Sequence, residues 1–254
     1  MLRELERYYE SYCGRIRQEA DALRTEKMPE LTEELFAIYE QTGNRLTYEG
    51  SYFRRRKFLA VFGLKAILDR EERDILKLEE VLEDICREEC WALPAHVDRK
   101  ADKDWRVFVD LFAAETAQTL SEITALLDEE LSEAVVSTVK REVMRRVLDP
   151  FSASSPPYSH WEYGASNWCA VCGGSVGSAA MYMMRDRPGE LEALLDRISH
   201  ALETYYLKSF AQDGACLEGL SYFTYGMTYF AGFAQQLYEF TAGKRDLLRS
   251  GKLA

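Results

Sequence analysis

The prolines of this chain constrain its fold more than any other residue type. Proline has no backbone amide hydrogen and its ring clashes with the preceding helical turn, so it is excluded from helix interiors. Each proline lies between stretches in which apolar residues recur at spacings of three and four, the period of an α-helix. The prolines occupy positions 29, 94, 150, 156, 157 and 188. The pattern predicts an all-α protein.

The helical stretches are of two kinds. Those at 71–91 and 129–148 carry an apolar stripe opposite Glu, Arg and Lys, as solvent-facing amphipathic helices do. Those at 168–184 and 218–240 have almost no charged residues and are rich in Gly, Ala and aromatic side chains, which is typical of helices enclosed on all sides. Because short connections favour antiparallel neighbours, we expect inner and outer antiparallel helices in two layers. The expected helices span roughly residues 3–24, 30–42, 52–67, 71–91, 104–127, 129–148, 168–185, 189–208 and 218–242.

Length and charge narrow the class of protein. With 254 residues, of which 47% are hydrophobic, the chain can bury a large core without disulfide staples. The net charge of -11 disfavours nucleic acid and anionic membrane surfaces as partners. The N-terminus lacks the basic stub and apolar run of a signal peptide, and no stretch reaches about 18 uninterrupted apolar residues. We expect a cytoplasmic protein that binds neither nucleic acid nor membrane.

The six cysteines are too sparse for a disulfide framework in a chain of this length. Cys169 and Cys172 have the spacing of a metal knuckle, and Cys86 and Cys90 lie one helical turn apart, so a four-thiolate zinc site is one interpretation. Both pairs lie inside apolar helical runs rather than in polar turns, which favours small buried hydrophobic side chains. We predict no bound metal.

One long connection, residues 149–166, is rich in aromatic residues. Tyr158, His160, Trp161 and Tyr163 are costly to leave in water, so the segment is expected to be an ordered loop rather than a linker. Long aromatic loops of this kind are often binding surfaces.

Tyr222, Tyr225 and Tyr229 recur at spacings of three and four, so they share one helical face. They form either a tyrosine stripe in a core or the wall of a polar cleft, since each buried phenol needs a hydrogen-bond partner. Asp213 and Glu218 stand before this helix, where they either cap it or act as general acid or base.

Other polar residues also have two interpretations. Asn167 opens a helix, so it is an N-cap or a functional amide. His96 is a surface-loop histidine or a cleft residue, His160 is expected to line the same cleft, and His200 is expected to be structural. The run at 54–57, Arg-Arg-Arg-Lys, is a solvated face or the basic patch that an acidic sugar would need.

Several motifs resemble the heparinase II/III-type polysaccharide lyases, from about residue 48 to residue 245, and the last two of them are the most specific. The motifs are Trp91-Ala-Leu-Pro-Ala-His96, Leu111-Phe-Ala-Ala-Glu-Thr116, Asn167-Trp168-Cys-Ala-Val-Cys172-Gly-Gly and Asp213-Gly-x-x-x-Glu218-Gly-x-x-Tyr222-x-x-Tyr225-Gly226. The resemblance implies an incomplete (α/α) toroid, usually followed by an antiparallel β-sandwich, with the active-site groove between the two.

The resemblance also implies roles for two catalytic residues. Asn167 falls where the family places the amide that neutralises the uronate carboxylate, and Tyr225 falls where it places the catalytic tyrosine. In β-elimination, a donor amide stabilises the charge that develops when the C5 proton is lost. A tyrosine with a locally lowered pKa can take that proton or give one to the departing oxygen, without metal or cofactor. Many members carry histidine where this chain has Trp168.

We therefore expect residues 1–254 to be one helical toroid domain directed at a uronate-containing acidic oligosaccharide or polysaccharide. The residues expected to bind substrate are His96, His160, Trp161, Trp168, Tyr222 and Glu218. The remaining toroid helices and the β-sandwich would lie outside this sequence, and without them an open, wet groove is expected to weaken or abolish lyase activity. The expected protein partner is that β-sandwich or a second copy of the chain.

Two alternatives to the lyase remain open. A glycoside hydrolase on the same helical scaffold would use Asp213 and Glu218 as its carboxylate pair. A non-catalytic carbohydrate-binding or protein-interaction module would keep the scaffold without turnover.

Overall fold

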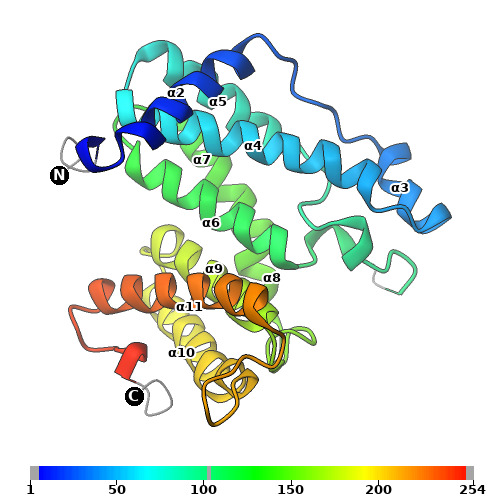
Figure 1. Ribbon diagram of the computed structural model, residues 1–254, viewed down its shortest axis with the longest axis vertical. Coiled ribbons are helices and arrows are strands. Elements are labelled where there is room, and N and C mark those ends of the chain that lie inside the picture. The colour runs from blue at the N-terminus through cyan, green and yellow to red at the C-terminus, as the bar shows by residue number, and fades with distance from the viewer. Residues whose placement is uncertain (1–5, 102–103, 250–254) are drawn as a thin grey trace. The chain divides into compact units, whose positions relative to one another are not determined.

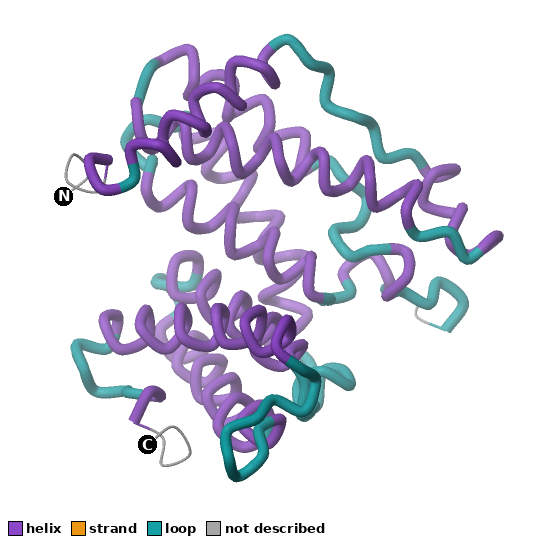
Figure 2. Tube along the Cα trace, viewed as in Figure 1, coloured by secondary structure: helices purple, strands orange, loops and turns teal. Residues whose placement is uncertain are grey.

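The computed structural model describes residues 6–101 and 104–249 (Figure 1). Within these ranges the regular secondary structure is helical apart from one isolated antiparallel bridge, Phe210 with Cys216, so the all-α prediction is confirmed (Figure 2). The chain divides into two compact units. The first combines residues 1–89, 93–103 and 122–142, and the second combines residues 90–92, 104–121 and 143–254.

The first unit is built from helices with clear start and stop signals. Thr32 caps α3 by accepting a hydrogen bond from the amide of Leu35, and Gly43 ends the helix in the left-handed conformation with φ of 72°. The predicted apolar stripe of α5 is buried at Ile75, Leu78, Leu82 and Ile85. The unit contains α2 (Glu10–Arg24), α3 (Glu33–Thr42), α4 (Leu46–Asp69), α5 (Glu72–Cys86), the short helix Pro94–His96 and most of α7 (Glu133–Val143).

The second unit holds the motifs that resemble the lyases. Most of α6 (Leu111–Leu126) belongs to it, and its other elements follow in chain order. These are the short helix Trp105–Val107, the π-helix Met144–Leu148, α8 (Asp149–Ala153), α9 (Asn167–Met183), α10 (Pro188–Thr204), the short helix Tyr206–Ser209, α11 (Leu220–Phe240) and the short helix Leu247–Arg249.

Pro150 contradicts the prediction that every proline separates two helices. It lies in the first turn of α8, and α8 follows the π-helix 144–148 without a break. The amide of Asp149 donates to the carbonyl of Met144, five residues back. A helix accommodates proline in its first turn because the amide that proline lacks has no helical partner there.

Helices α9 and α11 run in the same direction, and α10 runs antiparallel to α9. Gly173 of α9 packs against Ile198 and Leu202 of α10, and only a short connection joins the end of α9 at Met183 to the start of α10 at Pro188, so these helices run in opposite directions. Along α11 the direction is the same as along α9: Gly174 faces Tyr229, and Gly177 faces Phe233. A Cβ atom at residue 174 would lie 2.9 Å from the Tyr229 carbonyl oxygen. The glycines of α9 therefore permit this close helix approach.

The two helices that were predicted to be enclosed, α9 and α11, differ in how much of their surface is buried. In α9 nearly every residue from Asn167 to Met183 is buried, as expected. The prediction is wrong for α11, because this helix buries one stripe and exposes Tyr222 at 52%. The buried residues of α11 are Gly226, Phe230, Phe233, Ala234 and Leu237. A lack of charge misled the prediction, since threonine, tyrosine, glutamine and glycine all tolerate water.

Candidate functional site

Asn167 is fixed at the start of α9 by Glu218. The Glu218 carboxylate accepts a hydrogen bond from the Asn167 backbone amide at 2.6 Å and another from its Nδ2 at 2.9 Å. Asn167 is 3% exposed, and Ser166 before it makes no side-chain cap. The first hydrogen bond caps the N-terminus of α9, where a negative group is favoured. The second sets the orientation of the side-chain amide, because a carboxylate only accepts from the NH2 group.

Glu218 and Asp213 have separate structural roles in the segment that leads into α11. Asp213 is exposed, and its carboxylate accepts from the amide of Ala215 at 3.0 Å, as in an Asx turn. Gly219 follows Glu218 with φ of 93°, a conformation that glycine adopts readily. The sequence suggested that these acids cap the tyrosine helix, but Glu218 caps α9 instead. The two carboxylates do not act on a common partner among these contacts.

Tyr225 and Tyr229 converge on one carboxylate oxygen. Their hydroxyl groups donate to Glu115 Oε1 at 2.5 Å and 2.6 Å. The two rings stand edge to face with centroids 5.4 Å apart. Glu115 comes from α6, more than a hundred residues earlier in the chain. Each of these two phenols thus has the hydrogen-bond partner that a buried tyrosine needs.

The environment of Tyr225 keeps its phenol protonated. Burial raises the pKa of Tyr225 far above its usual value, and the negative charge of Glu115 and its hydrogen bond raise that pKa further. The expectation of a locally lowered tyrosine pKa was therefore wrong. Burial is the larger cause, and Glu115 adds to it. Sequence reasoning gave Glu115 no role, although it lies in the quoted Leu111–Thr116 motif. The available signal was that residues 111–121 contain no other charged residue.

The other predicted substrate-binding residues of the second unit make separate contacts. His160 lies against Trp168 with ring centroids 5.1 Å apart, and its Nδ1 is 3.2 Å from the Ser159 hydroxyl. Tyr222 is half-exposed and does not join the Glu115 cluster in the described contacts. Trp168 is partly buried, whereas His160 is exposed, so this pair offers an accessible aromatic surface close to Asn167 in sequence.

Trp161 is a core residue rather than a residue that lines an open groove. It is 1% exposed, stacks on Phe151 with centroids 5.7 Å apart, and donates from Nε1 to the carbonyl of Val109 at 2.9 Å. Tyr158 accepts from the amide of Val109, also at 2.9 Å. The aromatic loop is ordered, as expected, but its largest side chain serves packing.

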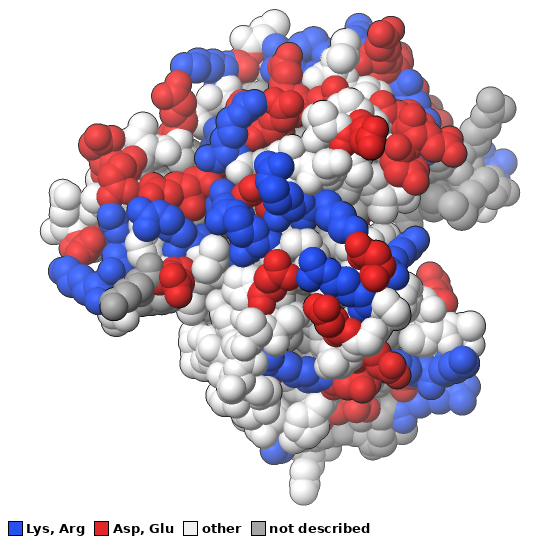
Figure 3. Space-filling view, turned by 180° about the vertical axis from the view of Figure 1, so that it is seen from behind, with Lys and Arg blue, Asp and Glu red and all other residues white. Residues whose placement is uncertain are grey.

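His96 and the basic run 54–57 belong to the first unit. His96 Nε2 lies 3.4 Å from the Arg45 guanidinium. The basic run makes ion pairs within the unit: Arg55 and Arg56 share Glu88, Arg54 pairs with Glu26, and Lys57 pairs with Glu19. Basic and acidic side chains are interspersed on the surface (Figure 3). The run thus neutralises carboxylates of the chain itself, which argues against a sugar-binding patch. The solvated-face interpretation fails for Arg55, which is 6% exposed.

The cysteines are free thiols, and the zinc interpretation gains no support. Burial raises the pKa of Cys169 to about 12 and holds that of Cys172 well above its usual value. A metal-binding cysteine must be deprotonated, and these sites oppose the thiolate. Cys169 donates from its sulfur to the Glu162 carbonyl at 3.4 Å instead. Both residues behave as small buried hydrophobic side chains, as the sequence suggested.

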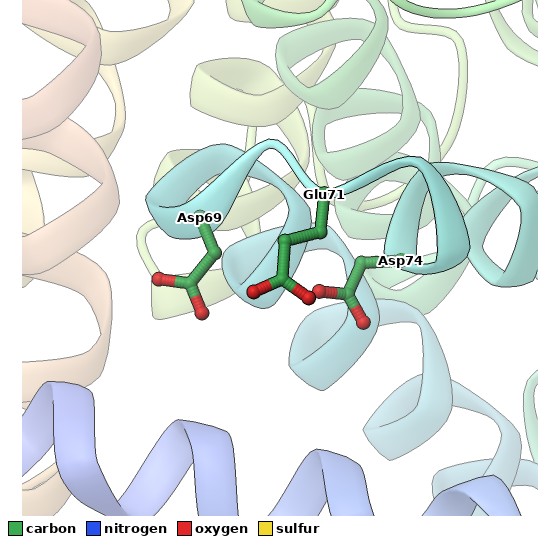
Figure 4. Close-up of side chains that lie close together, drawn as sticks. All are labelled: Asp69, Glu71 and Asp74. Carbon is green, nitrogen blue, oxygen red and sulfur yellow. The ribbon is translucent and has the colours of Figure 1, made fainter.

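Asp69, Glu71 and Asp74 bring three carboxylates together around the turn between α4 and α5 (Figure 4). Lys65 donates to Asp69 and to Asp74 at 2.6 Å each, and Arg17 pairs with Asp69 at 2.5 Å. These cations compensate the acidic groups, so the cluster is an ion-pair network inside the first unit rather than evidence for a metal site.

Comparison with protein-family models and with curated proteins gives no match for this chain. The helices of the described residues are all too short or too polar to cross a membrane.

Proposed function

We propose that this chain is the helical toroid domain of a polysaccharide lyase that cleaves a uronate-containing acidic polysaccharide by β-elimination. The observation that carries the proposal is the pairing of Tyr225 with Glu115 in the same unit, and on the same packed helix pair, as Asn167. The parallel course of α9 and α11 with α10 antiparallel supports an inner, outer, inner order of helices. That order is the repeat from which an (α/α) toroid is built.

Asn167 supplies the group that the reaction needs on the uronate carboxylate. When C5 loses its proton, negative charge spreads toward that carboxylate, and a fixed donor amide stabilises it. The Asn167 amide has two N–H donors, and Glu218 takes one of them. The second is the donor assigned to the substrate. Burial and the doubled contact with Glu218 hold this donor in place before substrate arrives.

Tyr225 supplies the proton transfer. Its phenol is protonated in the resting protein, so it can donate directly to the departing glycosidic oxygen. To take the C5 proton it must first pass its own proton to a neighbouring base. His160 and Trp168 offer an aromatic surface against which a sugar ring can stack.

The proposal is tested by following the unsaturated product. The purified chain is incubated with a panel of uronate polymers, and the absorbance of the new C4–C5 double bond is recorded, with and without any longer version of the protein. Product should form, and Asn167→Ala and Tyr225→Phe should each reduce its rate by about 10²-fold or more. Absence of product from both forms on every polymer, with Tyr225→Phe indistinguishable from the parent chain, would overturn the lyase assignment.

A non-catalytic carbohydrate-binding module is the second candidate. The half-exposed Tyr222 and the exposed His160 beside Trp168 favour it, because accessible aromatic rings are what sugar rings stack upon. This candidate predicts saturable binding of acidic oligosaccharides in calorimetry without unsaturated product. Binding that is lost in Trp168→Ala and retained in Tyr225→Phe would favour it over the lyase.

A further inference from the structure

Glu115 is a carboxylate set into an apolar helix and held by two phenols. Its neighbours Ala113, Ala114 and Ala117 on α6 are buried. Both donors reach the same atom, Oε1. A core stripe would place Phe or Leu at these positions and Ala at 115 with less desolvation cost. The arrangement therefore has a use beyond packing.

Hydrogen bonds of 2.5 Å and 2.6 Å join the two phenol oxygens directly to Glu115 Oε1. A proton on the Tyr225 oxygen needs to move only along that bond to reach the carboxylate. The Tyr229 hydroxyl stabilises the ionised carboxylate from a second side and so limits how basic it is.

We infer that Glu115 is the proton acceptor behind Tyr225, so that the pair, rather than the phenol alone, removes the C5 proton of the uronate. The inference rests on the proposed lyase function and adds the residue that makes a protonated tyrosine competent as a base. Glu115 acts through Tyr225 and is therefore a positioning residue that also holds a proton, while Tyr229 sets its basicity.

The proton balance closes over one cycle. The Tyr225 proton moves to Glu115 Oε1 as the phenol oxygen takes the C5 proton. The electron pair of the C5–H bond forms the C4–C5 double bond, and the bond from C4 to the glycosidic oxygen breaks. Tyr225 then gives the proton it received to that oxygen and recovers its own from Glu115. The C5 proton ends on the leaving group, and both side chains return to their starting forms.

Titratable groups of α9 and α11 lie near this carboxylate. Tyr225 and Tyr229 approach from α11, and the thiol of Cys172, itself kept protonated, lies close enough on α9 to interact with Glu115. The inference assigns the pH dependence of the step to Glu115.

The decisive variants change the basicity of the carboxylate and little else. Glu115→Gln keeps an oxygen acceptor for both phenols but cannot take up a proton. It is expected to lower kcat by about 10² to 10⁴-fold, the usual size of a lost general base, with KM within about threefold. Glu115→Asp keeps the chemistry and should recover at least part of the rate. A Glu115→Gln protein with near-parental kcat and an unchanged pH profile would overturn the inference.

Tyr229→Phe tests the role of Glu115 through the pH profile of kcat/KM, which would not change if these residues served only packing. Loss of one donor to the ionised carboxylate raises the pKa of Glu115, so the acidic limb of the kcat/KM profile should shift to higher pH. The matched control is Thr228→Ala, an exposed position on the same helix, which should leave the profile unchanged. An acidic limb that stays in place in Tyr229→Phe contradicts the assignment of that limb to Glu115.

A measurement without substrate distinguishes failure of the lyase proposal from failure of the inference about Glu115. Tyrosinate absorbance is titrated against pH in the parent chain and in Glu115→Gln. The same titration is repeated with Tyr225→Phe introduced into each of these two proteins, and subtracting each pair of curves gives the titration of Tyr225. Removal of the carboxylate charge should let Tyr225 ionise at lower pH. If no polymer is cleaved but this shift occurs, the lyase fails and the proton coupling of the pair stands. If polymers are cleaved and the shift and the rate loss are both absent, the lyase stands and the inference fails.

Discussion

The Glu218 carboxylate joins the Asn167 backbone and side chain at once, across 51 positions of sequence. One residue thereby ties the loop before α11 to the first turn of α9 and fixes the amide that the lyase proposal assigns to the substrate. This contact therefore serves both the stability of the fold and the geometry of the candidate site.

Replacement of Glu218 should cost stability even in the absence of substrate. Glu218→Ala removes the cap of α9 and leaves the Asn167 amide hydrogen without its acceptor, so the free energy of unfolding should fall by about 1 to 2 kcal/mol. Urea denaturation followed by circular dichroism measures the change. Asp213→Ala is the control, because it removes only an exposed turn contact and should cost less. Equal losses in the two variants would contradict the capping role.

The stability of the first unit should depend on pH through Asp69. Hydrogen bonds from Arg17, together with Lys65, lower the pKa of Asp69 from 3.8 to about 2. Because the folded pKa is depressed, the stabilisation is fully present above pH 3.8 and is lost as the pH falls through about 2. Solvent screening of this partly exposed group reduces the contribution to at most about 2 kcal/mol at neutral pH.

Asp69→Asn isolates this contribution. The variant should be less stable than the parent chain at pH 6, and the difference should shrink as urea unfolding is repeated toward pH 2. Glu71→Gln serves as the control, since Glu71 is exposed and pairs with the exposed Arg73. A difference that stays constant with pH would show that the loss arises from packing rather than from the carboxylate charge.

The sequence predicted the helices well because periodicity and proline report local geometry. The stripe Ile75, Leu78, Leu82 and Ile85 needs no long-range information to be identified as a buried face. Pro150 was misread because proline in the first helical turn is tolerated, and a π-helix that runs directly into that turn leaves no local signal.

The candidate site was predicted only in part, for reasons of chain distance. Asn167 and Tyr225 were identifiable from their motifs, but their partners, Glu218 and Glu115, are set by tertiary packing over 51 and 110 positions. The pKa of Tyr225 is raised first by burial and then by Glu115, and both depend on tertiary packing, so the shift was predicted with the wrong sign. Trp161 was assigned to a groove because an aromatic loop residue and an aromatic core residue have the same composition.

The thiols should differ sharply in reactivity. Cys169 and Cys172 are buried with raised pKa values, whereas Cys216 is partly exposed. A thiol reagent at neutral pH should modify Cys216 first and spare the other two until the protein unfolds. Mass spectrometry of peptides from the labelled protein measures this order, and Cys216→Ser should abolish the fast phase. Rapid labelling of Cys172 in the folded chain would contradict the buried position of α9.

The close approach of α9 and α11 should tolerate alanine at one glycine and not at another. Gly174→Ala places a methyl group 2.9 Å from the Tyr229 carbonyl oxygen, and backbone cannot move aside cheaply, so the free energy of unfolding should fall by about 1 to 3 kcal/mol. Gly232→Ala, in α11 with open space around its Cβ position, should instead stabilise the helix by up to about 1 kcal/mol. Urea denaturation of both variants provides the comparison. If Gly174→Ala were as well tolerated as Gly232→Ala, the packing of α9 on α11 would have to be looser than the structure shows. The close packing that holds the helices of Asn167 and Tyr225 together would then be contradicted.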